Sequence, residues 1–311
     1  MEWDTGAHFA PERQRSIPIR PAKNVSFHCG ISKRISSFGG GWGGATKNDA
    51  YAVTNPSAEN DMKIVRRGYL PDYEKMFREE AMPKLQEAVT DALFLLNRGH
   101  SLKRAVHIAM EHYQLSDAQR IAMTRGLVSN LEIKHRRQTQ RSKSDIEQKT
   151  VYLDGFNAII LMESLVSLSP VFRCMDHAIR DLANLKGSYH IIDKTESAIR
   201  LILAQLAQCH VQKLIIHIDN PVSNSRNLKK LILKLAQDYP FQTEVHLIDA
   251  CDKSFNQKDY VISGDGIVID HAQSWIPLYL WIVEDYAQNY PVWLIDFDKL
   301  ATQYRNIVND H

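Results

Sequence analysis

The spacing of apolar residues along the chain changes from one period to another near its middle. From Pro71 onward, apolar side chains recur at steps of three and four residues, which is the period of amphipathic helices. Ser101 and Ser116 stand where helix N-caps are expected, and Pro83 is expected to divide the first helical stretch in two. The pattern predicts a small helical bundle with short turns. An ordinary three-helix bundle is favoured over a helix-turn-helix arrangement.

From Thr150 the pattern becomes one of short apolar strands that alternate with amphipathic helices. Strands that are apolar throughout are typical of a parallel sheet that helices cover on both faces. The sequence therefore predicts an α/β domain with a parallel sheet flanked by helices, preceded by a small all-α bundle. The stretches expected to contain the strands are 150–154, 187–193, 211–219, 243–250 and 259–266.

These patterns divide the chain into four predicted segments. Residues 1–61 are rich in Gly, Ser and Asn without a sustained period, which predicts a flexible leader. Residues 62–135 form the helical bundle, 136–149 a basic linker, and 150–311 the α/β domain. The glycine cluster of the leader lacks the spacing of a phosphate-binding loop, so a nucleotide site is not expected there.

Composition places the chain among globular proteins. It has 311 residues, of which 44% are hydrophobic and 24% charged. No apolar run approaches the roughly 18–20 residues that a membrane-spanning helix needs, so no membrane partner is expected. The four cysteines, Cys29, Cys174, Cys209 and Cys251, are far apart in the sequence. Reduced thiols in a cytoplasmic protein are the expected state, and a zinc site is not expected.

The net charge of +2 hides a difference between the two halves of the chain. Residues 61–150 carry 17 Lys and Arg against 12 Asp and Glu, whereas residues 151–311 carry 14 against 19. Two interpretations remain open: a nucleic-acid tether beside a metal-binding catalytic domain, or two domains that attract each other. The basic run 134–143 also allows two interpretations: a phosphate-contacting arm or a solvated linker. The arm interpretation makes Arg136, Arg137 and Arg141 candidate contacts to nucleic acid.

Several predicted strands end in an acidic residue. Carboxyl ends of parallel strands meet at one edge of the sheet, where ligands of open α/β folds bind. Carboxylates gathered there repel one another unless a cation neutralises them, and hard oxygen ligands select Mg²⁺ or Mn²⁺. Such a cation activates water for attack on a phosphodiester. The strand-terminal acids are Asp154, Asp193, Asp219, Asp249 and Asp265.

A strand-terminal aspartate also serves as an N-cap for the following helix. For Asp193 and Asp249 the cap or loop interpretation is favoured. Asp154 is followed by glycine, with Asn157 placed to share its ligand sphere, and is therefore expected to bind metal. The D-x-D pattern of haloacid-dehalogenase phosphatases is absent, because Phe156 stands where the second acid is required.

Two motifs carry a resemblance to known families. "VYLDGFN" (151–157), followed much later by "VISGDGIVID" (261–270), is similar to the PIN-like nucleases, especially their NYN branch. The helical stretch 91–126 resembles an uncharacterised prokaryotic family, domain of unknown function four hundred thirty-four. Further motifs of that family match here at the residues Asp154 to Asn157, Glu163, Arg180, Asp181, Asp219 to Arg226 and Asp265 to Asp270.

The resemblance covers about residues 70–275 and has two departures. Arg226 stands where the family pattern has glycine, and Ser263 stands where threonine is common. Arg226 is either a phosphate contact or only a change in the loop.

The resemblance also implies roles for individual residues. Asp154, Asp219 and Asp265 would be metal ligands, with Asp181 and Glu163 in support, although Glu163 has solvent or a pair with Arg180 as alternatives. Asp252 is a possible fourth acid, and His217 is expected to lie buried in the sheet without a role. The remaining candidates are Asn157 for orienting the attacking water, and Ser223, Ser225 and Arg226 for phosphate contact.

The expected function is metal-dependent phosphodiester hydrolysis with Mg²⁺ or Mn²⁺. RNA is the expected substrate, and this choice rests on family analogy alone. The alternative is a non-catalytic nucleic-acid-binding or regulatory protein with the same fold. A third candidate is a phosphatase or nucleotide hydrolase that uses the same acids on a small substrate.

Overall fold

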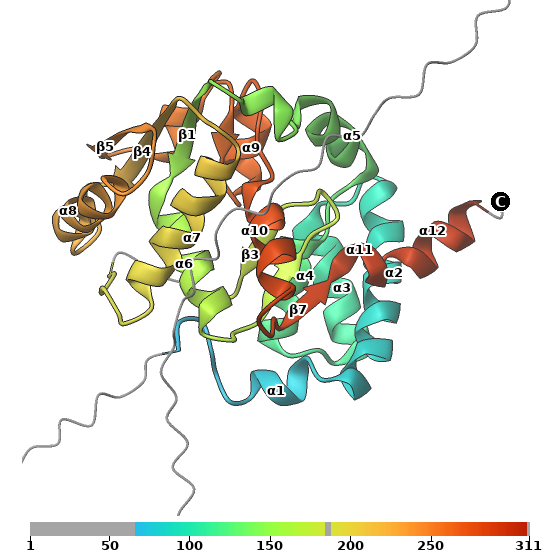
Figure 1. Cartoon of the computed structure of the whole chain (residues 1–311). Helices are drawn as coiled ribbons and strands as arrows, with labels where there is room; N and C mark the ends of the chain where they lie inside the picture. Colours follow the sequence, from blue (N-terminus) through green and yellow to red (C-terminus); the bar gives the residue numbers. More distant parts are fainter. Residues whose placement is uncertain (1–65, 184–187, 310–311) are drawn as a thin grey trace, which may run out of the picture. The chain divides into compact units, whose positions relative to one another are not determined.

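A computed structural model describes residues 66–183 and 188–309 of the chain (Figure 1). The predicted leader, residues 1–61, lies outside the described residues. The first half of the described chain is helical, as the sequence predicts. Its elements are α1 (Tyr73–Met76), η1 (Glu79–Ala81), α2 (Met82–Asn97), α3 (Leu102–Tyr113), α4 (Asp117–Gly126), α5 (Asn130–Thr139) and η2 (Ser144–Ile146).

Short polar side chains begin these helices at the expected places. The Ser101 side chain accepts a hydrogen bond from the backbone N–H of Arg104 at the start of α3. Ser116 forms a reciprocal capping box with Gln119 at the start of α4. Pro83 lies in the first turn of α2, where its missing N–H costs nothing, so the helical stretch divides just before it.

The helical region extends further than the sequence predicts. Ser129 and Glu132 form a second capping box, which starts α5 and carries it to Thr139. The first residues of the predicted linker, 136–139, are therefore helical. No helix in the described ranges is both long and apolar enough to cross a membrane.

The second half of the chain contains the predicted parallel sheet. Its strands are β1 (Thr150–Asp154), β4 (Lys213–Asp219), β5 (Gln242–Ile248) and β6 (Val261–Ile262). They lie in the order β5-β4-β1-β6, and every neighbouring pair is parallel. The chain moves outward from β1 to β5 and then returns to place β6 on the other side of β1. The carboxyl ends of β1 and β6 therefore flank the point where the strand order reverses.

Helices cover both faces of this sheet. A large apolar core joins the strands to α6 (Gly155–Val166), α7 (Thr195–Gln208), α8 (Ser225–Ala236) and α10 (Leu278–Ala287). A smaller cluster joins Val261 of β6 to Phe255 of η3 (Asp252–Phe255) and Val268 of α9 (Gly266–His271). The fold class predicted from the strand pattern is thus confirmed.

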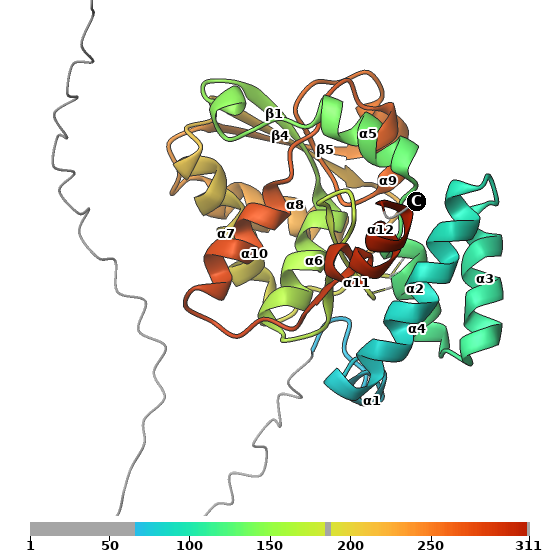
Figure 2. The same cartoon turned by 90° about the vertical axis from the view of Figure 1, so that its right-hand side faces the viewer.

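A second, three-stranded sheet connects the two halves and was not predicted. It consists of β3 (Ile179–Asp181), β2 (Val171–Arg173) and β7 (Leu294–Asp296), in that order. After β7 the chain forms α11 (Phe297–Leu300) and α12 (Thr302–Asn309), and α12 packs on α2 (Figure 2). Phe172, Phe297 and Tyr304 belong to the same buried core as the helical bundle. The C-terminal segment therefore completes the N-terminal bundle.

The strand predicted within 187–193 is wrong for the residues that the structure describes there. Residues 188–192 form no strand. Instead, the Tyr189 ring is fully buried and packs edge-on against Phe156. The backbone N–H of Tyr189 donates to Ser223 Oγ, which in turn donates to the Tyr189 carbonyl. These side-chain bonds satisfy the peptide groups that a strand would have paired with a neighbour.

Candidate functional site

Asp154 lies at the reversal point of the main sheet and is held there by a residue from the neighbouring strand end. Ser263, just after β6, donates from Oγ to Asp154 Oδ2 at 2.9 Å. The same hydroxyl accepts the backbone N–H of Asp265 at 3.1 Å. Asp154 is buried and occupies the N-cap position of α6, but its side chain makes no capping bond. The backbone N–H of Asn157 still lies close enough to lower the pKa of Asp154.

Burial and neighbouring acids raise the pKa of Asp154 to about 7. Burial is the largest cause, and the Ser263 hydrogen bond opposes it. The carboxylates of Asp219 and Asp252 raise this pKa further. Burial and then Asp252 also raise the pKa of Asp219, while burial and then Asp265 raise that of Asp252. Four carboxylates from four different segments thus act on one another at this edge.

Asp265 also caps a helix, a role that the sequence analysis favours only for Asp193 and Asp249. Its Oδ1 accepts the backbone N–H of Ile267 at 2.7 Å and caps α9. The cap interpretation therefore applies to Asp265, although its carboxylate also faces Asp252.

Asp249 does not act on this group; its Oδ1 accepts a hydrogen bond from Asn220 at 2.8 Å. Asp193 pairs with Lys194 in the loop before α7.

The donor set at this edge suits a cation that keeps much of its water. Within residues 66–183 and 188–309, no three His, Cys, Asp or Glu side chains are already arranged to hold a metal ion. Mg²⁺ is commonly bound through one or two carboxylates and several waters, so it does not require such a cage. The carboxylate oxygens of Asp154, Asp219, Asp252 and Asp265 fit a hydrated Mg²⁺ or Mn²⁺ by chemistry.

Tyr279 was not found by sequence reasoning, because it lies within an apolar run that reads as core. Its side chain is buried, and its hydroxyl has no hydrogen-bond partner in the part of the chain that the structure describes. Burial raises its pKa well above the ordinary value, and the carboxylates of Asp154 and Asp181 raise it further. A buried polar group without a partner is rare in folded proteins. The Tyr279 hydroxyl therefore marks a position beside Asp154 where a ligand or water would bond.

Of the four carboxylates at the sheet edge, Asp265 lines a cleft of about 680 Å³. Asn157, Asp181, Gly264 and Asp265 line it together with Arg125 from α4. A Cβ added to Gly264 would lie 3.0 Å from Asn157 Oδ1, so the loop after β6 needs a residue without a side chain. The cleft therefore meets the acidic edge at Asp265, with Asn157 in the same lining.

Asp181 lies at the end of β3, on the second sheet. Its Oδ1 accepts the backbone N–H of Ala183 at 2.6 Å and lies 3.5 Å from Arg125 Nη1. Burial raises the pKa of Asp181 to about 6, and Arg125 opposes this shift. The carboxylates of Asp154 and Asp181 both raise the pKa of Tyr279, but Asp181 has Arg125 as its own partner.

Glu163 is a structural residue and not a support for the metal site. It is fully buried on α6, where Arg67 Nε donates to its Oε2 at 2.7 Å. Tyr189 and Thr195 donate from their hydroxyls to Oε1. The expected alternatives, solvent or Arg180, are both replaced by this network, because a buried charge requires a complete set of partners.

Arg136 is also buried and does not form part of an exposed arm. Its guanidinium donates to Asp270 at 2.7 Å and to Asp176 at 2.6 Å. Asp176 also accepts Arg180 Nη2 at 2.8 Å, and Arg180 Nε reaches the Gly264 carbonyl at 2.5 Å. The expectation that Arg136 contacts nucleic acid is corrected, since this network uses its donors to hold the loop after β6.

The other predicted contacts lie on several surfaces. Ser223 bonds to Tyr189, and Ser225 Oγ donates to the Asn220 carbonyl at 3.3 Å. Arg226 is exposed at the start of α8. Arg137 is exposed on α5, whereas Arg141 is partly buried and its backbone N–H bonds to Trp275.

His217 is buried, as expected. Its Nδ1 lies 2.6 Å from Ser254 Oγ. Burial lowers the pKa of His217 to about 4, so this imidazole is neutral near pH 7.

Two family models match consecutive parts of the chain. The model described as "Protein of unknown function (DUF434)" matches residues 84–139. The model described as "Domain of unknown function (DUF5616)" matches residues 143–280. The resemblance of the helical region to the first family is thus confirmed. The α/β region, which the sequence analysis placed in the same family, matches a separate one.

A relative matches more than half of the chain. "Uncharacterized protein MJ0935" of Methanocaldococcus jannaschii is 31% identical over 185 residues, which is 60% of this chain and 88% of the relative. No solved structure matches the chain. At this identity and coverage, the chain belongs to the same protein family as MJ0935, with a DUF434 region followed by a DUF5616 domain.

Proposed function

We propose that this protein hydrolyses phosphodiester bonds in nucleic acid, with RNA as the substrate and Mg²⁺ or Mn²⁺ as the cofactor. The observation that carries the proposal is the convergence of Asp154, Asp219, Asp252 and Asp265 at the reversal point of the parallel sheet. Burial and neighbouring carboxylates raise the pKa of Asp154, Asp219 and Asp252, as is expected where negative charges lie close together. A bound divalent cation would balance those charges.

Each residue of the edge has a definable part in this proposal. The four carboxylates would hold the cation, and Ser263 fixes Asp154 in place through the 2.9 Å hydrogen bond. When bound, the cation would stabilise charge on the phosphoryl oxygens and make the attacking water more acidic. Asn157 lines the cleft and would orient that water, while the unpartnered Tyr279 hydroxyl would donate to a ligand oxygen.

The resemblance of the D-G-F-N and S-G-D-G motifs to PIN-like nucleases of the NYN branch supports the same activity. Those motifs are Asp154 to Asn157 and Ser263 to Gly266 in this chain. They flank β1 and β6, the two strands that meet at the reversal point. The choice of RNA over DNA rests on this resemblance alone.

The first test measures cation binding through thermal unfolding. A ligand that binds only the folded state raises the melting temperature with its concentration. Millimolar Mn²⁺ is expected to raise the melting temperature of the wild type and of Asp249→Asn, a matched change at a strand end outside the acidic group. Mn²⁺ is expected to leave the melting temperature of Asp154→Asn unchanged. Equal shifts in all three proteins would place the cation elsewhere.

The second test measures cleavage with the same three proteins. Wild type and Asp249→Asn are expected to cleave labelled single-stranded RNA with Mn²⁺, and Asp154→Asn is expected to lose activity by at least about a hundredfold. A DNA strand of the same sequence and a small phosphomonoester are assayed in parallel. Activity on the phosphomonoester alone would replace the proposed function by that of a phosphatase.

The competing function is nucleic-acid binding without cleavage. It is favoured by the fact that no three ligands in the described ranges are preassembled for a metal ion. This function would be established if the wild type binds RNA, shows no change in melting temperature with Mn²⁺ and cleaves no RNA.

A further inference from the structure

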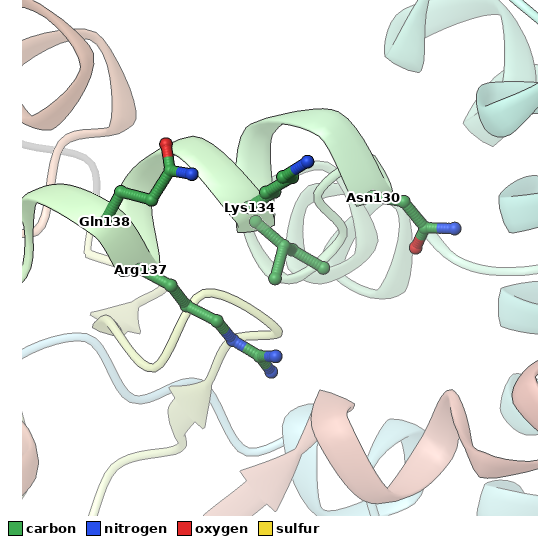
Figure 3. Close-up of a pocket in the computed structure, with 5 residues that line it drawn as sticks. Asn130, Lys134, Arg137 and Gln138 are labelled. Carbon is green, nitrogen blue, oxygen red and sulfur yellow. The ribbon is translucent and has the colours of Figure 1, made fainter.

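One face of α5 carries a hollow of about 400 Å³ with a basic and amide lining. Its residues are three or four positions apart, so they form one stripe along the helix. In Figure 3 the Arg137 side chain leaves α5 toward neighbouring segments, while the side chains of Lys134 and Gln138 leave the same helix on another side. The lining residues are Asn130, Ile133, Lys134, Arg137 and Gln138.

The positive charges of this hollow are not used inside the protein. Lys134 and Arg137 are exposed, and within residues 66–183 and 188–309 neither forms an ion pair or a side-chain hydrogen bond. Arg136, the residue beside Arg137, shows the contrast, because Asp176 and Asp270 take up its guanidinium. The donors of Lys134 and Arg137 are thus available to a ligand.

A second segment adds positive charge beside α5. The pKa of His177, in the turn between β2 and β3, is lowered by burial and then by Arg137 and Arg173. Both guanidinium groups therefore lie near the same imidazole. Arg173 Nε is buried and has no hydrogen-bond partner among the described residues. Arg173 does not line the hollow, so the cationic donors of the hollow itself are those of Lys134 and Arg137.

The acids near this place already have partners. Asp298 and Asp176 act on His177 in the opposite direction. Asp298 accepts Arg305 Nη1 at 2.9 Å, and Asp176 is held by Arg136 and Arg180. They do not neutralise Arg137 and Arg173.

We propose that this α5 hollow binds a backbone phosphate of the nucleic acid, through Lys134 and Arg137 with the amides of Asn130 and Gln138. Guanidinium and ammonium groups form charge-assisted hydrogen bonds with phosphate oxygens, and the amides add neutral donors. The ligand class rests on the proposed function, because a phosphate contact of this kind carries no sequence information by itself.

The position of the hollow suits a strand that continues to the acidic edge. Glu132 and Arg136, on the adjacent face of α5, line the cleft that contains Asn157 and Asp265. The helix therefore has the phosphate site on one side and the cleft on the other. A nucleic-acid strand bound in the hollow would cross α5 to reach the cleft.

The test measures the binding of fluorescein-labelled single-stranded RNA in EDTA, so that no divalent cation supports cleavage. Each phosphate contact contributes about 0.7 to the slope of log affinity against log salt for a single strand. The double variant Lys134→Ala/Arg137→Ala removes the contact to one phosphate, so it is expected to bind more weakly and to lose about 0.7 from that slope. Fluorescence anisotropy measures the affinity for RNA at each salt concentration of a series.

The matched control is Lys103→Ala/Arg104→Ala, which removes one exposed lysine and one exposed arginine from α3. It is expected to keep the wild-type affinity and slope. Equal losses in the two double variants would mean that charge acts diffusely, and an unchanged slope in the α5 variant would mean that no contact exists there. Either result, or a wild type that binds no RNA, overturns the inference.

The two proposals fail in different ways. Asp154→Asn is expected to bind RNA in EDTA as the wild type does, because the acids do not form the α5 hollow. If the wild type binds through α5 but never cleaves with Mn²⁺, the proposed hydrolysis fails and the phosphate site stands. If cleavage occurs while the α5 variant binds normally, only the phosphate site fails.

Discussion

At the residue scale, Asp176 joins two arginines beside the candidate site. Its carboxylate is fully buried and pairs with Arg136 at 2.6 Å and with Arg180 at 2.8 Å. Burial alone would raise the pKa of Asp176, but the two arginines outweigh burial and lower it. Arg180 in turn bonds to the Gly264 carbonyl, so this pair positions the loop that carries Ser263 and Asp265.

We expect Asp176→Asn to destabilise the fold strongly at neutral pH. Removing one partner from a buried ionic group costs about 3–5 kcal/mol. The contribution of Asp176 is present above its unfolded pKa and is lost as pH falls through its lower folded value. Urea unfolding should therefore show a large difference from wild type at pH 7, and this difference should shrink below about pH 4, where an aspartate of the unfolded chain becomes protonated.

The control for this change is Asp238→Asn, which breaks an exposed pair with Arg200. It should cost less than about 1 kcal/mol at pH 7. A loss for Asp176→Asn that stays constant into the acid range would mean that packing, and not charge, accounts for its contribution.

The sequence identified some of these residues and missed others for physical reasons. Asp154 and Asp265 could be predicted because a strand end and a nearby glycine are local signals. The burial of Arg136 could not be predicted from the sequence, because its partners Asp176 and Asp270 lie 40 and 134 residues away in the chain. Tyr279 carries no local signal that separates it from an ordinary core aromatic residue.

At the scale of the single element, α5 connects the helical bundle to the candidate site. It begins at a capping box in which Ser129 Oγ accepts the backbone N–H of Glu132 at 3.3 Å and Glu132 Oε2 accepts that of Ser129 at 3.0 Å. Its Arg136 carbonyl accepts the Trp275 indole N–H at 2.7 Å. The helix therefore depends on its cap at one end and on a distant tryptophan at the other.

Ser129→Ala should weaken α5 by about 1 kcal/mol, because it removes the side-chain acceptor of the cap. Urea unfolding measures the loss, and amide hydrogen exchange should be faster in the first turn of α5. Ser129→Asp keeps an acceptor and should remain close to wild type. If Ser129→Asp loses as much as Ser129→Ala, the cap is not the cause.

The strands of the main sheet were predictable, and those of the second sheet were not. The strands β1, β4 and β5 and the helices with serine caps follow from periodicity and local start signals. The strands β2, β3 and β7 have only three residues each, which is too short for any period to appear. The stretch 187–193 reads as a strand from its apolar residues, but Tyr189 bonds to Ser223 and is drawn into the core.

At the scale of the whole described structure, the two halves of the chain share a core. Phe297, 171 residues after Gly126, packs against it so closely that a side chain at position 126 has no room. The Phe297 and Phe172 ring centroids are 5.8 Å apart, and the rings meet edge to face. The sequence predicted the α/β class correctly, but this long-range packing leaves no periodic signal.

Phe297→Ala should cost about 3–5 kcal/mol, because it leaves a cavity under the helical bundle. Phe297→Leu fills part of that space and should cost less. Urea unfolding followed by helix circular dichroism and by tryptophan fluorescence should show one shared transition at lower urea. A loss below about 1 kcal/mol for Phe297→Ala would mean that the bundle does not need the C-terminal segment.

The contact of α12 with α2 has a consequence for protein synthesis. A ribosome releases α2, α3 and α4 long before it reaches β7, α11 and α12. During that interval the apolar faces of the early helices lack Phe297 and Tyr304, so they are open to chaperones or to other nascent chains. The folding of the N-terminal bundle is therefore completed by residues that the ribosome adds only after the main sheet.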